Sequence, residues 1–176
     1  MKKRYKKGQI WIETVIYTLI ALVMIGVVLS VVKQKIEEGQ DKIIIEGSIN
    51  MLEDINTIFL SIKGVVGNKR QIQVSIKKGA LEIDGINNQI LFEMESEYEY
   101  SEHGKNVSYG NVIANTKKTG KTSIVTLTTN YPNEYDIQYK EKDEKKSLTK
   151  SQTPYKIFIT NNGENGGKTI IDLEVV

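Results

Sequence analysis

A single carboxylate stands in the longest apolar stretch of this 176-residue chain. From residue 9 to residue 32, Glu13 is the only charged residue, and residues 14–32 are 19 uncharged residues made mainly of Val, Ile and Leu. An acid at the centre of a membrane helix costs about 2.5–3.5 kcal/mol, and less near the interface. Such a residue is expected to pair with a cation. The simpler alternative places Glu13 at the headgroup level, facing Lys6 or Lys7.

The rest of the chain offers little catalytic chemistry. It has no Cys, which excludes a thiol nucleophile, a disulfide scaffold and Cys-based zinc or iron–sulfur sites. The only histidine, His103, lies between Glu102 and Gly104, where we expect a turn and no general base. No nucleophile–base pair or metal cluster can be assembled. We therefore expect no enzyme, no cofactor and no resident metal.

Two further motifs resemble binding sites only superficially. Residues 120–122 read Gly-Lys-Thr, as at the end of a phosphate-binding loop, but Asn115 stands where that loop needs Gly, and a strand pattern follows in place of a helix. A charged hairpin turn is the better interpretation. Glutamates alternate at 93, 95, 97 and 99. They form a line on one strand, whereas calcium needs convergent ligands, so we expect a solvated sheet face.

Two surface features remain hypotheses. Asn106-Val107-Ser108 is a sequon, and Asn106 is a possible N-glycosylation site if this region is exported. The run from residue 140 to residue 150 mixes both charge signs and predicts a solvated loop.

A helix over the apolar stretch would position Glu13, and the length of this stretch fits the thickness of a membrane. About 20 helical residues cross a bilayer core of about 30 Å, so residues 13–32 predict a transmembrane helix. Residues 1–8 carry five positive charges and no negative one. Lys and Arg stay cytoplasmic, which places the N-terminus inside and the later residues outside. A cleaved secretory signal is disfavoured because the apolar run is long and lacks a small-residue cleavage site.

The string from Lys7 to Val23, KGQIWIETVIYTLIALV, resembles the class III signal peptide of archaeal type IV pilins. The resemblance covers about the first 32 residues. It implies that a prepilin peptidase cuts between Gly8 and Gln9, with Arg4, Lys6 and Lys7 serving leader recognition and orientation. It also implies that Glu13, then the fifth residue of the mature chain, sets the register of a neighbouring subunit during filament assembly.

Physical chemistry agrees with this role of Glu13. Cleavage would create an ammonium at Gln9, four residues and about 6 Å along the helix from Glu13. Opposite charges attract strongly in a low-dielectric bundle, and an unpaired charge costs several kcal/mol there.

Some details of the sequence depart from the pattern of related families. Bacterial pilins usually begin with Phe and often carry a helix proline, whereas this chain has Gln9 and no proline before Pro132. Archaellins generally lack the glutamate, which favours an adhesion-type pilin.

Beyond the apolar stretch, residues 33–64 predict an amphipathic continuation of the same helix. Ile45, Leu52 and Phe59 recur every seven residues, as do Ile55 and Ile62. This stripe can pack on the chain's own downstream domain or on a neighbouring subunit, and the pattern leaves both open. Gly64 or Gly67 is a natural helix stop.

From residue 70 on, the apolar period becomes two, which predicts strands. The expected strands lie at about 72–76, 81–83, 89–100, 107–114, 122–130, 134–140, 155–160 and 169–175, with a loop at 161–167. The predicted fold is therefore α+β. A leader (1–8) and a long N-terminal helix (9–64, transmembrane at 13–32 and amphipathic at 33–64) precede an extracellular antiparallel β domain (68–176), a sandwich or a meander.

The resemblance implies a structural subunit of an archaeal type IV pilus-like filament for surface attachment. Its partners would be the membrane, copies of itself, the prepilin peptidase, and an assembly ATPase with its membrane platform protein. No nucleic acid partner is expected. The alternatives are a pseudopilin or minor pilin for secretion or DNA uptake, and an unprocessed single-pass surface protein. The net charge of +2 would belong to the leader, because residues 9–176 carry 19 Lys and Arg against 22 Asp and Glu.

Overall fold

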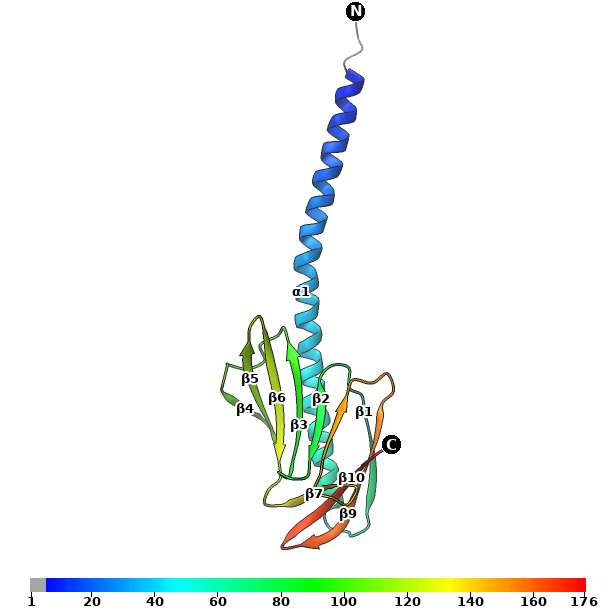
Figure 1. Cartoon of the computed structure of the whole chain (residues 1–176), viewed down its shortest axis with the longest axis vertical. Helices are drawn as coiled ribbons and strands as arrows, with labels where there is room; N and C mark the ends of the chain where they lie inside the picture. The colour runs from blue at the N-terminus through cyan, green and yellow to red at the C-terminus, as the bar shows by residue number, and fades with distance from the viewer. Residues whose placement is uncertain (1–5) are drawn as a thin grey trace, which may run out of the picture. The chain divides into compact units, whose positions relative to one another are not determined.

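A computed structural model describes residues 6–176, with side chains from residue 10 onward (Figure 1). The chain forms one helix, α1 (Lys6–Ile62), followed by ten strands. It divides into two compact units, one up to Gly39 and one from Gln40 to Val176. The predicted α+β layout, a long apolar N-terminal helix before an antiparallel-rich β domain, is confirmed.

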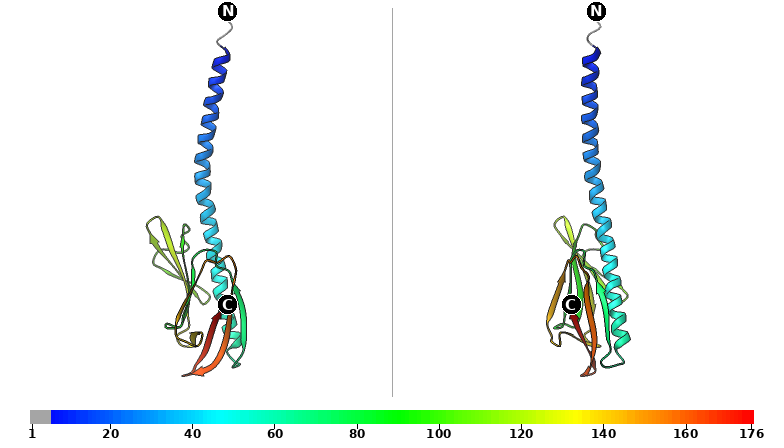
Figure 2. Two further views of the ribbon diagram at one scale, coloured as in Figure 1. Left: turned by 45° about the vertical axis from the view of Figure 1, so that its right-hand side comes forward. Right: turned by 90° about the vertical axis from the view of Figure 1, so that its right-hand side faces the viewer.

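The second unit contains two sheets (Figure 2). A four-stranded sheet has the order β1-β9-β10-β7, and a six-stranded sheet has the order β4-β5-β6-β3-β2-β8. All pairs are antiparallel except β7 with β10, so the order is more complex than a meander. The strands are β1 (Lys69–Val74), β2 (Ala80–Asp84), β3 (Gln89–Ser96), β4 (Asn106–Tyr109), β5 (Val112–Thr119), β6 (Thr122–Asn130), β7 (Tyr135–Tyr139), β8 (Lys145–Thr149), β9 (Tyr155–Asn165) and β10 (Lys168–Val175).

The C-terminal part of α1 completes the core of this unit. The predicted heptad stripe, Ile45, Leu52 and Phe59 with Ile55 and Ile62, is buried to 1% exposure or less and joins the inner faces of both sheets in one cluster. Of the two alternatives left open by the pattern, these side chains pack on the chain's own domain. Burial of an Ile, Leu or Phe side chain contributes about 1.5–3 kcal/mol, so this stretch of helix is an integral part of the domain.

The helix end is held by a residue from the opposite end of the sequence. Asn161 of β9 donates from Nδ2 to the carbonyl oxygens of Ile62 (2.8 Å) and Lys63 (3.1 Å). The last carbonyls of a helix have no partner within it, and this buried amide satisfies that of Ile62 together with that of the next residue, Lys63. The prediction of a loop over 161–167 is wrong, because β9 continues through Asn161 to Asn165 paired with β10, and only Gly166-Gly167 turns the chain.

Three other sequence predictions need correction. The strand expected at 89–100 ends at Ser96, whose hydroxyl bonds the backbone N–H and carbonyl of Tyr98 and turns the chain away. The strand expected at 107–114 is instead a hairpin of β4 and β5, with Gly110 at φ 58° in the turn. A side chain at Gly110 would collide with the Glu53 carboxylate on α1.

The charged run 140–150 is also not simply a loop, because residues 145–149 form edge strand β8. Only Leu148 of β8 is buried, so the alternation that identifies a strand is nearly absent. Lys145 instead secures the strand, with its ammonium 2.7 Å from Oδ2 of the fully buried Asp84 at the end of β2. Lysine on an edge strand also discourages pairing with other chains.

Asp84 organises the turn between β2 and β3. Its carboxylate accepts hydrogen bonds from the backbone N–H groups of Ile86 and Asn87 (3.1 Å each) and from the side-chain amides of Asn87 and Gln89. Burial alone would raise the pKa of Asp84, but the Lys145 ammonium and these hydrogen bonds outweigh it and hold the pKa well below its usual range.

A folded-state pKa below the unfolded one means that Asp84 stabilises the fold above about pH 4 and loses that contribution as the pH falls below it. Asp84→Asn should lower the free energy of unfolding at pH 7 by about 1–3 kcal/mol and flatten its fall between about pH 4 and pH 2. Urea titration across this range measures both. Glu82→Gln, which removes a partly exposed partner of Lys145, is the control and should change stability by less than about 1 kcal/mol. Equal acid slopes in Asp84→Asn and the parent chain would contradict this role.

Candidate functional site

The first unit is described as a helix whose residues from 10 to 37 are all exposed. No residue from Ile10 to Val32 is buried within the protein, and the large apolar side chains there are between about half and three-quarters exposed. α1 is long and apolar enough to cross a membrane. Apolar surface on every side of a helix must be covered by lipid or by other apolar helices, since water would leave it unfavourably exposed.

The polar residues of this stretch are compatible with an apolar environment. The Thr14 hydroxyl donates to the carbonyl of Ile10 (2.9 Å), and the Thr18 hydroxyl donates to that of Thr14 (2.8 Å). These bonds along the helix satisfy both hydroxyl donors without water, as lipid requires. Glu13, by contrast, carries a formal charge, and its side chain is exposed in the single chain.

The predicted processing residues are described only in part. Lys6, Lys7, Gly8 and Gln9 belong to the first turns of α1 by their backbone. Arg4 lies outside the described residues. All of these positions, like Glu13, fall in the first unit. Of the predicted processing and assembly residues, Lys6, Lys7, Gly8, Gln9 and Glu13 lie on one continuous helical segment.

Asn106, the predicted glycosylation position, lies in the second unit at the start of edge strand β4. Its side chain is exposed, and its Oδ1 accepts a hydrogen bond from Nδ2 of Asn115 on the neighbouring strand (2.8 Å). The exposure is compatible with modification at the surface of the domain.

The other motifs weighed from sequence have structural roles. Gly120 and Lys121 form the turn between β5 and β6, as predicted, with Gly120 at φ 66°. The four alternating glutamates at 93–99 are exposed, as predicted, but only Glu93 and Glu95 lie on the sheet face, because β3 ends at Ser96. Glu99 contacts His103 (3.1 Å) and Lys118 (3.4 Å), and both groups lower the pKa of the Glu99 carboxyl. Within residues 6–176, no three His, Asp or Glu side chains are arranged to hold a metal ion.

One ion pair missed at the sequence level ties α1 to the sheets where the second unit begins. Asp41 is 3% exposed, and its Oδ1 lies 2.6 Å from Nζ of Lys78, while its Oδ2 accepts a hydrogen bond from the backbone N–H of Glu97 (2.8 Å). An isolated acid beside Lys42 in an amphipathic helix looks like an ordinary surface residue. Only the fold brings the loop before β2 and the end of β3 to this carboxylate.

Comparison of the chain with protein-family models, with curated proteins and with solved structures yields no match. The fold and the site define a class by themselves: a chain with one membrane-capable N-terminal helix and a C-terminal β domain suited to an extracellular setting.

Proposed function

We propose that the chain is a structural subunit of a type IV pilus-like surface filament of the archaeal kind, which serves attachment to surfaces. A prepilin peptidase removes residues 1–8, and an assembly ATPase with a membrane platform protein, both separate proteins, drives assembly. The precursor lies in the membrane with its N-terminus inside and its β domain outside. The mature chain lies in the filament, bound to other copies of itself.

The observation that carries this proposal is the coincidence of four features on one segment. These are a basic leader, a Gly8-Gln9 junction, a glutamate five residues after the junction, and an apolar helix with no buried residue from 10 to 32. A plain membrane anchor needs the basic residues and the apolar run, but it has no use for Glu13 close to a new N-terminus. A filament needs all four.

Apolar helices exposed on every side can bundle when they leave the lipid, because each helix then covers the others. The second half of α1 supports this arrangement. Since Ile45, Leu52 and Phe59 are built into the core of the β domain, a helix that enters a bundle brings its domain with it. The domains would then form the outer layer of the filament.

Cleavage after Gly8 is the first experimental test. The chain extracted from native membranes should show an intact mass corresponding to residues 9–176, and Gly8→Val should restore the mass of the uncut chain. Gly26→Val, in the same helix with open space around the Cβ position, is the matched control and should be cut normally. A parent chain that retains residues 1–8 in native membranes would refute processing and favour an unprocessed surface protein.

A further inference from the structure

Asn-Gly and Asp-Gly pairs can rearrange chemically without an enzyme, and the chain contains three of them. They are Asp84-Gly85, Asn162-Gly163 and Asn165-Gly166. In this reaction the backbone nitrogen of the glycine attacks Cγ of the preceding residue and closes a five-membered succinimide ring. Glycine favours the attack because it has no Cβ to hinder it. Whether a pair reacts in the folded chain therefore depends on whether its glycine nitrogen is free.

The fold protects the Asp84-Gly85 pair. The backbone N–H of Gly85 donates to the carbonyl oxygen of Glu144 (3.1 Å), so this nitrogen is engaged outside the pair. The Asp84 carboxylate is fully buried, pairs with Lys145 and accepts hydrogen bonds from the turn that follows. An ionised carboxylate is also a poor electrophile. We expect no reaction at this pair while the domain is folded.

The Asn162-Gly163 pair has an exposed asparagine but an engaged nitrogen. The N–H of Gly163 donates to Oδ1 of Asn161 (2.8 Å). Asn161 is buried and fixed on both sides, because its backbone carbonyl accepts a hydrogen bond from Gly67 (2.7 Å) and its N–H donates to Asn68 (3.1 Å). Release of the Gly163 nitrogen therefore requires β9 to open next to the residue that caps α1.

The Asn165-Gly166 pair lies at the tip of the hairpin between β9 and β10. Gly166 and Gly167 are the turn residues, at φ 59° and 81°, and Asn165 with Lys168 is the last pair of the ladder. Asn165 and Gly166 are exposed, and within residues 6–176 the Gly166 N–H donates no hydrogen bond. Only the last residue pair has to open for this nitrogen to reach Cγ of Asn165, and such openings are the least costly in a fold.

We propose that Asn165 is the site of spontaneous deamidation in the folded chain, and that the fold protects Asn162. The deprotonated Gly166 nitrogen attacks Cγ of Asn165, the Cγ–Nδ2 bond breaks, and the amide nitrogen takes up a proton and leaves as ammonia. Water then opens the succinimide at either carbonyl, which gives aspartate or isoaspartate. The inference concerns the β domain alone and is independent of how the N-terminal helix is processed.

The products differ from the parent chain in charge and in backbone length. Both place a new carboxylate at the hairpin tip, beside the exposed Glu164. Isoaspartate also adds a methylene group to the main chain, which disturbs the register of the pair with Lys168. The reaction therefore converts a neutral turn at the surface of the domain into an acidic one.

The test follows deamidation by mass spectrometry in the full chain, kept in detergent at mildly alkaline pH. Trypsin releases residues 157–168 as one peptide that contains both asparagines, because Lys156 and Lys168 bound it. Fragment ions then assign the new acid to one position or the other. In the folded chain Asn165 should react at least about tenfold faster than Asn162, a ratio that corresponds to about 1.4 kcal/mol in the free energy of opening.

Two controls separate the effect of the fold from that of the sequence. In urea both Asn-Gly pairs are released from the structure, so their rates should become similar. Asn165→Gln should remove most of the reaction in the folded chain, because glutamine would have to close a less favourable six-membered ring, whereas Asn162→Gln should leave it unchanged. The proposal is overturned if Asn162 reacts as fast as Asn165 in the folded chain, if neither reacts there while both react in urea, or if the preference for Asn165 persists in urea.

Discussion

Replacing Glu13 with glutamine is expected to reduce the yield of surface filaments at least about tenfold, with cleavage after Gly8 unchanged. In the parent chain the Glu13 carboxylate would compensate the ammonium of a neighbouring Gln9 inside the bundle. The amide cannot, so each added subunit would bury an uncompensated charge at a cost of several kcal/mol, and 1.4 kcal/mol already corresponds to a factor of ten. Sheared filaments quantified against total membrane-bound chain provide the measurement.

The control for Glu13 makes the same chemical change on the same helix. Glu37 lies beyond the apolar segment and forms only a long contact of 3.8 Å with Lys33, with both side chains largely exposed. Glu37→Gln should therefore assemble at the parent level, because exposed ion pairs contribute about 0–1 kcal/mol. Filaments of Glu13→Gln at parent abundance would remove the proposed register role, even if cleavage after Gly8 were established.

Replacing Phe59 with alanine is expected to lower the free energy of unfolding of the β domain by about 3–5 kcal/mol. The ring is fully buried and contacts Tyr131 and Tyr135, so alanine would leave a cavity in the middle of the core cluster that joins α1 to both sheets. Near-UV circular dichroism of the tyrosines during urea unfolding measures the loss.

The neighbouring residue provides the control for Phe59. Leu60 follows on the same helix but is 57% exposed, so Leu60→Ala should change stability by less than about 0.5 kcal/mol. A similar loss in both variants would contradict a specific contribution from the buried Phe59 ring, because alanine is the better helix former at both positions and helix propensity alone would cause no loss. A small loss at Phe59 alone would mean that the core can collapse around the missing ring.

The elements predicted correctly from sequence are those whose side chains alternate between core and water. The seven-residue spacing of Ile45, Leu52 and Phe59 predicted the buried face of α1, and the period of two predicted strands at 122–130 and 169–175, close to the observed β6 and β10. In both cases the spacing of apolar residues in the sequence follows directly from which face of the helix or strand is buried.

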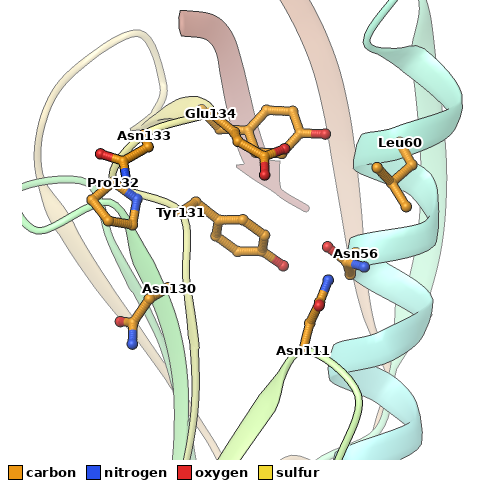
Figure 3. A pocket seen from close by; sticks show the side chains of 9 residues that line it. Asn56, Leu60, Asn111, Asn130, Tyr131, Pro132, Asn133 and Glu134 are labelled. Carbon is orange, nitrogen blue, oxygen red and sulfur yellow. The ribbon is translucent and has the colours of Figure 1, made fainter.

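The features that were missed depend on contacts between distant residues. Edge strand β8 buries only Leu148 and relies on Lys145 meeting Asp84, which lies 61 positions earlier in the chain. A pocket in the second unit likewise combines Asn56 of α1 with Asn111 and Tyr131 from two separate connections (Figure 3). No periodicity relates these positions, so only the folded chain identifies them. The proposed processing site differs, because its residues are contiguous in the sequence and the structure adds only that Lys6 to Gln9 are helical.

The position of the only tryptophan has a practical consequence. Trp11 lies on the apolar part of α1, is 75% exposed in the single chain, and is two residues from Glu13, whereas the β domain contains tyrosines but no tryptophan. Indole emission therefore reports the surroundings of the N-terminal helix alone, without labelling. A subunit in lipid, in detergent or in a filament bundle carries its own optical probe next to the carboxylate proposed to set the register. Seven of the nine tyrosines lie in the β domain, so the tyrosine signal reports mainly whether the domain is folded.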